Sequence, residues 1–147
     1  MIWNNSVLNP NWVTGFIDGE GCFHVAISKN KTLRLGYQVQ LQFSITQHIK
    51  DIKLMSEFVT FFNCGYIASD GPLKVQFRIR DINHIKENLI PFLDDNPLLT
   101  LKKLDYADFK EIFSLMIDGK HLQDEGFLKI KEIQKNMNRR RRTYELE

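Results

Sequence analysis

The sequence predicts an α+β fold of order αββαββα, with further helices after the last of these elements. Two pairs of segments alternate apolar and polar residues with the period of a β-strand, and a segment with helical spacing follows each pair. Because this hairpin-and-helix unit occurs twice, we expect one four-stranded sheet with helices packed on its apolar face. A chain of 147 residues is long enough for one such domain, which we take to cover residues 1–147 with a basic C-terminal segment at 135–147.

The first predicted helix runs from Pro10 to Glu20. Asn9 can cap it, because an Asn side chain accepts hydrogen bonds from the unpaired amides of the first turn, and the fixed φ of proline suits the first helical position. Apolar residues then fall on odd positions in two segments, which predicts a first hairpin with one buried face. These strands are expected at 22–27 and 38–47.

The rest of the chain repeats this order. Helical spacing of apolar residues follows the first hairpin, and a second hairpin is expected around the turn Asp70-Gly71-Pro72. Three helices are predicted after it, separated by Asn96-Pro97 and by Asp118-Gly119. The predicted segments are a helix at 50–62, strands at 66–69 and 73–80, and helices at 82–92, 101–117 and 123 to about 137.

The composition is that of a globular protein, with 43% hydrophobic and 26% charged residues. No run of roughly eighteen apolar residues is present that could span a bilayer, and the N-terminal stretch lacks the features of a secretory signal or an organelle transit peptide. We therefore expect the protein to act in the compartment where it is made. Cys22 and Cys64 have no partner at zinc-binding spacing, so both are expected to be reduced and packed.

Positive charge is concentrated in parts of the chain, although the formal net charge is only +2. No Asp or Glu lies between Gly21 and Lys50, and none lies in the stretch 71–80. Both stretches carry lysine and arginine, and Lys135 precedes a third basic cluster at 139–142. Local positive fields of this kind attract a polyanion whatever the total charge.

The polar face of the predicted sheet carries no acidic residue. Gln hydrogen-bonds bidentately to adenine, Arg and Lys bind guanine, and Ser can contact either base, so this face favours readout of DNA in the major groove. A solvated sheet surface is the alternative, but such surfaces usually mix Glu with Lys and Thr. The expected base-contacting residues are His24, Ser28, Gln38, Gln40, Gln42, Ser44, Lys74, Gln76, Arg78 and Arg80.

Two further basic groups accompany this face. Those in the loop of the first hairpin are expected to contact the DNA backbone or flanking bases. The cluster near the C-terminus is either a solvated tail or a clamp on phosphates, and the sequence leaves both open. The loop residues are Lys29, Asn30, Lys31 and Arg34, and the C-terminal residues are Arg139, Arg140 and Arg141.

The predicted first helix ends in the stretch VTGFIDGEG, on an acidic side chain. Unpaired carbonyls and the helix dipole make a helix C-terminus negative, so a cation is expected beside Glu20. With Asp18 and the carbonyl of Gly19, Glu20 offers the hard oxygen atoms that Mg²⁺ or Ca²⁺ prefers. Gly15 and Gly19 leave a smooth strip on which an identical helix could pack. Alternatively, Gly19 and Gly21 only end the helix, and Glu20 faces solvent.

VTGFIDGEG resembles the nine-residue motif of the LAGLIDADG homing endonucleases, and the resemblance covers nearly the whole chain. It implies the αββαββα core of that family, with a four-stranded antiparallel sheet shaped as a saddle and helices on one face. Within the motif, the matching residues are Gly15, Ile17, Asp18, Gly19, Glu20 and Gly21. The other matching segments are Cys22-Phe23, Ile45-Thr46-Gln47, Cys64-Gly65-Tyr66-Ile67, Ile90-Pro91-Phe92 and Leu98 to Tyr106.

The resemblance also implies an activity, the site-specific cleavage of a long and roughly palindromic duplex DNA that leaves short 3′ overhangs. Glu20 and the carbonyl of Gly19 are implied to hold Mg²⁺, with Ca²⁺ or Mn²⁺ able to replace it in binding. Gln47 matches a glutamine that orders water near the metal, although it could also be only the last polar residue of the sheet face. Lys102, or its neighbour Lys103, fits the basic residue near the scissile phosphate.

A single copy of the motif implies a homodimer, because each motif helix delivers one acid. The nearest echo of the motif, Met116-Ile117-Asp118-Gly119-Lys120, has a lysine where an acid is needed. The contact between the two copies is expected to involve Trp12, Gly15, Phe16 and Gly19.

Other functions fit the same scaffold. The main alternative is an RNA maturase that helps to splice its own intron. A DNA-binding regulator without catalysis is disfavoured by Glu20, and a fragment of a two-motif monomer is disfavoured by the C-terminal helices. By resemblance, the gene is expected to be an intron reading frame in a mitochondrion or chloroplast, and the expected partners are duplex DNA, a second copy and intron RNA, without a membrane.

Overall fold

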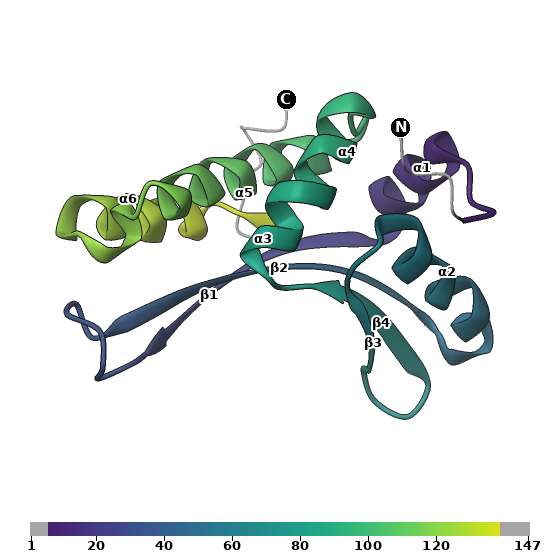
Figure 1. Ribbon diagram of the computed structural model, residues 1–147, viewed down its shortest axis with the longest axis horizontal. Coiled ribbons are helices and arrows are strands. Elements are labelled where there is room, and N and C mark those ends of the chain that lie inside the picture. The colour runs from purple at the N-terminus through teal and green to yellow at the C-terminus, as the bar shows by residue number, and fades with distance from the viewer. Residues whose placement is uncertain (1–5, 139–147) are drawn as a thin grey trace. The chain divides into compact units, whose positions relative to one another are not determined.

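The computed structural model describes residues 6–138, and Figure 1 shows their helices and strands. The four strands form one sheet in the order β1-β2-β4-β3, so β1 and β3 are its edge strands. The predicted order αββαββα with additional C-terminal helices is confirmed. The elements are α1 (Pro10–Glu20), β1 (Gly21–Lys29), β2 (Tyr37–His48), η1 (Ile49–Asp51), α2 (Ile52–Phe62), β3 (Tyr66–Ser69), β4 (Lys74–Ile79), α3 (Ile82–His84), η2 (Ile85–Leu89), α4 (Ile90–Asp95), α5 (Lys102–Ile117), η3 (Lys120–Leu122) and α6 (Asp124–Lys135).

The chain divides into two compact units. The first unit holds residues 1–22 and 42–100, and the second holds residues 23–41 and 101–147. Strand β2 contributes its last residues to the first unit and its first residues to the second. The expectation of a single domain over 1–147 stays a prediction.

Phenylalanines from α2 and β4 form the centre of the first unit. Phe58, Phe62 and Phe77 are fully buried, and the ring centroid of Phe77 lies 5.8 Å from that of Phe58 and 5.7 Å from that of Phe62. Aromatic pairs at these separations add to the free energy of burying the rings. Helix α2 lies beside the hairpin β3–β4 (Figure 1). Its aromatic face therefore holds it there.

The segment from Ile82 to Asp95 is helical throughout but is not one regular helix. Helices α3 and α4 are joined by η2, a π-helical turn. Pro91 explains this turn, because proline has no N–H and its ring clashes with the carbonyl four residues earlier in a regular α-helix. A wider π turn avoids that clash. The helix predicted at 82–92 therefore exists, but it contains this turn and extends to Asp95.

In the second unit, helices α5 and α6 lie side by side (Figure 1). Phe23 of β1 is fully buried against α5, with its ring centroid 5.4 Å from that of Tyr106 and 5.2 Å from that of Phe109. These rings join the first predicted strand to the helix predicted at 101–117, which the structure places at Lys102–Ile117.

Side chains at the end of α6 and just after it hydrogen-bond to the backbone of the edge strand β1. The Gln134 amide donates to the carbonyl oxygen of Val25 at 2.6 Å, and the Asn138 amide donates to the carbonyl oxygen of Phe23 at 2.8 Å. An edge strand exposes carbonyl groups that could pair with another chain. These two hydrogen bonds therefore satisfy the edge of β1 from within the second unit.

Expectations drawn from the composition are met in part. None of the helices in the described part of the chain is long and apolar enough to span a membrane. Cys64 is buried as expected, and burial, with a smaller contribution from Asp81, raises the pKa of its thiol to about 11. Cys22 is exposed, so the expectation that it is packed is wrong. It stands on an even position of β1, where side chains point away from the buried face.

Candidate active site and nucleic-acid interface

Helix α1 presents the carboxylate of Glu20 at its C-terminal end. Asn9 caps the other end, where its side chain accepts a hydrogen bond from the amide of Asn11 at 2.8 Å, as predicted. Glu20 is exposed, and no basic residue lies in the last turn. Within residues 6–138, the Glu20 side chain makes no hydrogen bond or ion pair. An available carboxylate therefore stands at the negative end of a helix.

Asp18, two residues earlier, is occupied by hydrogen bonds. Its Oδ2 accepts from the amide of Leu99 at 2.9 Å. Its Oδ1 accepts from the amide of Thr100 at 3.1 Å and from the Thr100 hydroxyl at 2.7 Å. Both carboxylate oxygens therefore bind the segment before α5. We assign Asp18 to this tether, and not to a cation site beside Glu20 as the sequence suggested.

The glycines of the motif fall into two groups. A Cβ atom on Gly21 would lie 2.8 Å from both the carbonyl oxygen and Cγ2 of Ile17, so only glycine fits where α1 turns directly into β1. At Gly15 and Gly19, a Cβ would meet no atom within 4 Å in the described part of the chain. Gly21 is thus required by the turn, whereas Gly15 and Gly19 leave an open strip on α1. The alternative that Gly19 and Gly21 only end the helix fits Gly21, which is the C-cap, and the exposed Glu20. Whether Glu20 binds a cation stays a prediction.

A groove of about 360 Å³ lies beside this open strip. Gly15 forms part of it, and Leu99 adds an apolar side chain that is 84% exposed. Asp18 also lines the groove, so the tether to Leu99 and Thr100 helps to shape it. The full lining is Asn11, Thr14, Gly15, Asp18, Asp95, Asn96, Pro97 and Leu99.

Trp12 and Phe16 pack into the first unit. The ring centroids of Trp12 and Phe16 are 5.0 Å apart. The centroid of Phe58 lies 6.2 Å from that of Trp12 and 5.6 Å from that of Phe16. Trp12 nevertheless remains 43% exposed. Both rings therefore stabilise α1 on α2 within one chain, and their predicted contact with a second copy stays a prediction.

Gln47 and the two candidate lysines occupy different elements. Gln47 of β2 pairs with Val75 of β4, which is only 5% exposed. Directly paired residues share a face of the sheet, so Gln47 lies on the core side, and the alternative that it only ends the polar face is wrong. Lys102 is the half-buried first residue of α5, and Lys103 beside it is exposed. Which lysine serves the active site stays a prediction.

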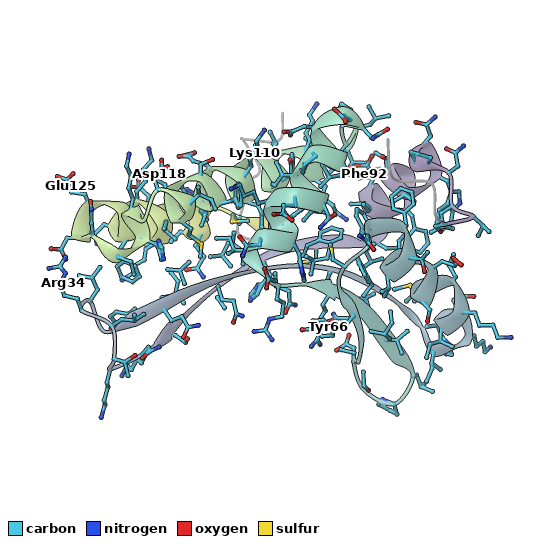
Figure 2. All side chains as sticks on the ribbon, viewed as in Figure 1. Arg34, Tyr66, Phe92, Lys110, Asp118 and Glu125 are labelled. Carbon is cyan, nitrogen blue, oxygen red and sulfur yellow. The ribbon has the colours of Figure 1, made fainter. Side chains whose placement is uncertain are left out.

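The polar face of the first unit consists of even-numbered residues of β2, β4 and β3. Figure 2 shows Tyr66 on this side of the sheet and the buried Phe92 on the other. Because Lys74, Gln76 and Arg78 all lie on the polar face, their predicted placement is confirmed. The register pairs Arg78 with Ser44 and Tyr66, Gln76 with Thr46 and Ala68, and Lys74 with His48.

The register also changes the set of surface residues. Ser44 is only 4% exposed, so the prediction that it contacts a base is wrong: a serine side chain is short, and its partner across the ladder is an arginine. Thr46, His48 and Tyr66 lie on the polar face and were missed. The alternation of even positions, continued to the end of β2 and applied to β3, would have found them.

The loop of the first hairpin belongs to the second unit and is shaped by Asn30. Its Oδ1 accepts from the amide and hydroxyl of Thr32 at 3.0 and 2.6 Å, and its amide donates to Gln38 at 3.1 Å. Arg34 donates to the carbonyl oxygen of Leu122 at 3.5 Å (Figure 2). The exposed residues of this region are His24, Ser28, Lys29, Lys31, Arg34 and Gln38, and Gln40 is half-buried. Arg139, Arg140 and Arg141 lie outside the described residues.

The end of α1 offers few ligands to a metal ion. Among residues 6–138, no three His, Cys, Asp or Glu side chains gather closely enough to hold an ion. The hard oxygen donors at the end of α1 are the Glu20 carboxylate and the backbone carbonyl of Gly19. A divalent ion bound here needs further oxygen ligands.

The αββαββα fold and the acid-ending motif helix together define the class of protein. The family model described as LAGLIDADG endonuclease matches residues 13–113, and the chain belongs to that family. The family and fold expected from the sequence are confirmed.

Among the relatives, the chain is 38% identical over 133 residues to "Probable intron-encoded endonuclease 2" of Neurospora crassa. The aligned region covers 89% of this chain and 29% of that protein. The homing endonuclease I-TnaI is 40% identical, with a TM-score of 0.87 over 95% of this chain and 93% of its own. I-SmaMI, bound to an uncleaved DNA target in the presence of calcium ions, is 31% identical, with a TM-score of 0.88 over 92% of this chain and 46% of its own. The chain thus spans less than a third of the length of the curated relative.

Proposed function

We propose that this chain is a homing endonuclease that hydrolyses both strands of a long, roughly palindromic DNA duplex. The observation that carries the proposal is Glu20, an exposed carboxylate without a partner among the described residues, at the end of a helix whose glycine strip is open. An acid at a helix C-terminus lowers stability unless a cation accompanies it. The names of the relatives, including an endonuclease and homing endonucleases, agree with DNA cleavage and give no support to a maturase.

The donor set at the end of α1 fits a hard divalent ion, and we assign Mg²⁺. Glu20 and the carbonyl of Gly19 hold it, and Ca²⁺ or Mn²⁺ can replace it in binding. When bound, such an ion activates water and stabilises the leaving oxygen of a phosphodiester. The calcium present with the DNA complex of I-SmaMI supports the use of a divalent ion in the family.

The missing ligands come from a second copy of the chain and from the DNA phosphates. Two copies of α1 can approach closely along Gly15 and Gly19, where no side chain intervenes. Trp12, through its exposed part, and Phe16 border this contact. A twofold axis between the helices then gives each strand of a palindromic duplex one Glu20. The short 3′ overhangs are what the resemblance to the family implies.

The remaining residues bind and orient the DNA. Basic and amide side chains on the polar sheet face contact bases in the major groove, and Lys29 and Lys31 contact the backbone. Gln47 orders water at the active site, and Lys102 or Lys103 contacts the scissile phosphate. The intron-encoded relative supports an origin in an intron, which we place in a mitochondrion or chloroplast.

Cleavage and binding of DNA by Glu20→Gln test this function. Target duplexes are first recovered as cleaved sites from a randomised library with Mg²⁺ present. Removing the carboxylate is expected to reduce cleavage by more than about a hundredfold, since loss of even an indirect metal contact costs 10- to 100-fold. Binding measured by gel shift should change little, because phosphate contacts supply most of the affinity.

Asp118→Asn is the matched control. Asp118 is also an exposed acid at the end of a helix, α5, and it lies in the motif echo that has Lys120. This variant should cut at the rate of the unmodified chain. A Glu20→Gln variant with full cleavage activity would overturn the metal-ligand assignment.

A further inference from the structure

We propose that Gln76 is a positioning residue that holds Arg78 for the readout of a guanine, and is not itself a base-contacting residue. The sequence placed both side chains among the base contacts. The inference rests on the proposed DNA-cleaving function and assigns different roles to two neighbours on its polar face.

Both ends of the Gln76 side chain are hydrogen-bonded. Arg78 Nε donates to Gln76 Oε1 at 2.7 Å, and Gln76 Nε2 donates to Thr46 Oγ1 at 2.9 Å. An arginine side chain has only donors, so the oxygen of the amide must face Arg78. The nitrogen must then face Thr46, whose hydroxyl can accept. The chemistry of the two neighbours therefore fixes the orientation of the amide.

A glutamine reads adenine by donating to N7 and accepting from N6 with the same two atoms. Gln76 has already used both, and it is half-buried between Thr46 and Ala68 in register. The amide keeps a second hydrogen and a second lone pair, but turning it toward an adenine would weaken or break the two internal hydrogen bonds. Ala68 carries no polar side-chain atom that could replace either of them. Gln76 is thus poorly suited to contact a base.

Arg78 keeps the atoms that guanine readout needs. The hydrogen bond to Gln76 uses Nε and is the one that the Arg78 side chain makes within residues 6–138. The two terminal nitrogens remain, and a pair of such donors matches O6 and N7 of guanine in the major groove. Holding the guanidinium before DNA arrives reduces the conformational entropy lost on binding. The chain Thr46–Gln76–Arg78 therefore presents one preorganised guanine-binding group.

The test is the base preference of bound duplexes, measured by sequencing a randomised library after binding by the chain of residues 1–147 in Ca²⁺. The unmodified chain should select guanine at one position in each half of the target. Arg78→Ala should lower that preference about tenfold, within the range of one bidentate contact. Gln76→Met, which removes both hydrogen bonds at similar size, should lower the same guanine preference several-fold and change no adenine preference.

Two further variants separate positioning from a general loss of structure. Gln76→Glu keeps an acceptor for Arg78 Nε, so the guanine preference should remain. Gln42→Met is the matched control, because Gln42 of β2 lies on the same face of the sheet and its side chain makes no hydrogen bond within the described residues. The Gln42→Met variant should change the base preference at a different base pair from the one that Arg78 reads. Thermal melting of each variant shows whether it is folded.

Each outcome decides between the roles. Loss of an adenine preference in Gln76→Met, with guanine retained, would identify Gln76 as a reader and overturn the inference. So would an Arg78→Ala variant that weakens binding equally for all sequences, because that result indicates a phosphate contact. A chain that binds no duplex at all would instead overturn the proposed function, and this inference with it.

Discussion

Asp18 and Glu20 are acids two positions apart on one helix, yet the fold uses them in opposite ways. Asp18 has both oxygens bound by Leu99 and Thr100, whereas Glu20 is exposed and makes no contact of this kind among the described residues. The pair Gly21 and Gly19 differs in the same way, since only Gly21 is required by a close neighbour. The motif thus contains an inner set that holds the chain together and an outer set that is open to a partner.

Gly21→Ala should have the largest effect on stability. Its Cβ would clash with the backbone oxygen of Ile17, which cannot move without unwinding the end of α1. Overpacking of this kind costs about 1–3 kcal/mol of the free energy of unfolding. Urea denaturation measures it, and a variant as stable as the unmodified chain would remove Gly21 from the inner set.

Asp18→Asn should have the next largest effect on stability. An asparagine oxygen can still accept, but its amide nitrogen would face a donor on Leu99 or Thr100, so at least one hydrogen bond is lost. We expect a loss of about 1–2 kcal/mol in the free energy of unfolding. Thr100→Val removes one of the three hydrogen bonds to Asp18 without changing the size of the side chain much. It should therefore lower the free energy of unfolding by less. If Asp18→Asn were as stable as the unmodified chain, the hydrogen bonds of Asp18 to Leu99 and Thr100 would not hold this segment in place.

Gly19→Ala should act on assembly and leave the single chain intact. The added Cβ meets open space within the chain, and alanine favours a helix over glycine by about 0.5–1 kcal/mol, so the unfolding free energy should not fall. The methyl group would project from the open strip into the proposed helix–helix contact. Sedimentation should therefore show a weaker dimer, and an unchanged dimer would place the contact elsewhere.

Glu20→Gln should have the smallest effect on stability, although the proposed function predicts the largest effect on cleavage. Removing a negative charge from a helix C-terminus stabilises it by about 0.3–1 kcal/mol at low ionic strength. Denaturation of the metal-free chain at low and high salt measures this gain, which salt should reduce. A loss of stability would show that Glu20 belongs to the inner set.

Much of the fold follows from local patterns that the sequence displays. The cap at Asn9, the buried odd positions of β4 and the hairpin turn near Gly71 depend on neighbours within a few residues. The motif helix and its terminal acid are found in the same way. The π turn near Pro91 was missed, because a pattern of apolar residues does not distinguish a wide turn from a regular one.

The sequence by itself determined the order of the elements, the polar face of the sheet and an acid at the end of a glycine-containing helix. Only the tertiary structure decided which acid is engaged, since the partners of Asp18 lie 81 and 82 residues further along the chain. It also decided that Ser44 is buried and that Gln76 is bound at both ends, 30 residues from Thr46. Residue type states what a side chain can bind, whereas strand register and chain packing determine what lies within its reach.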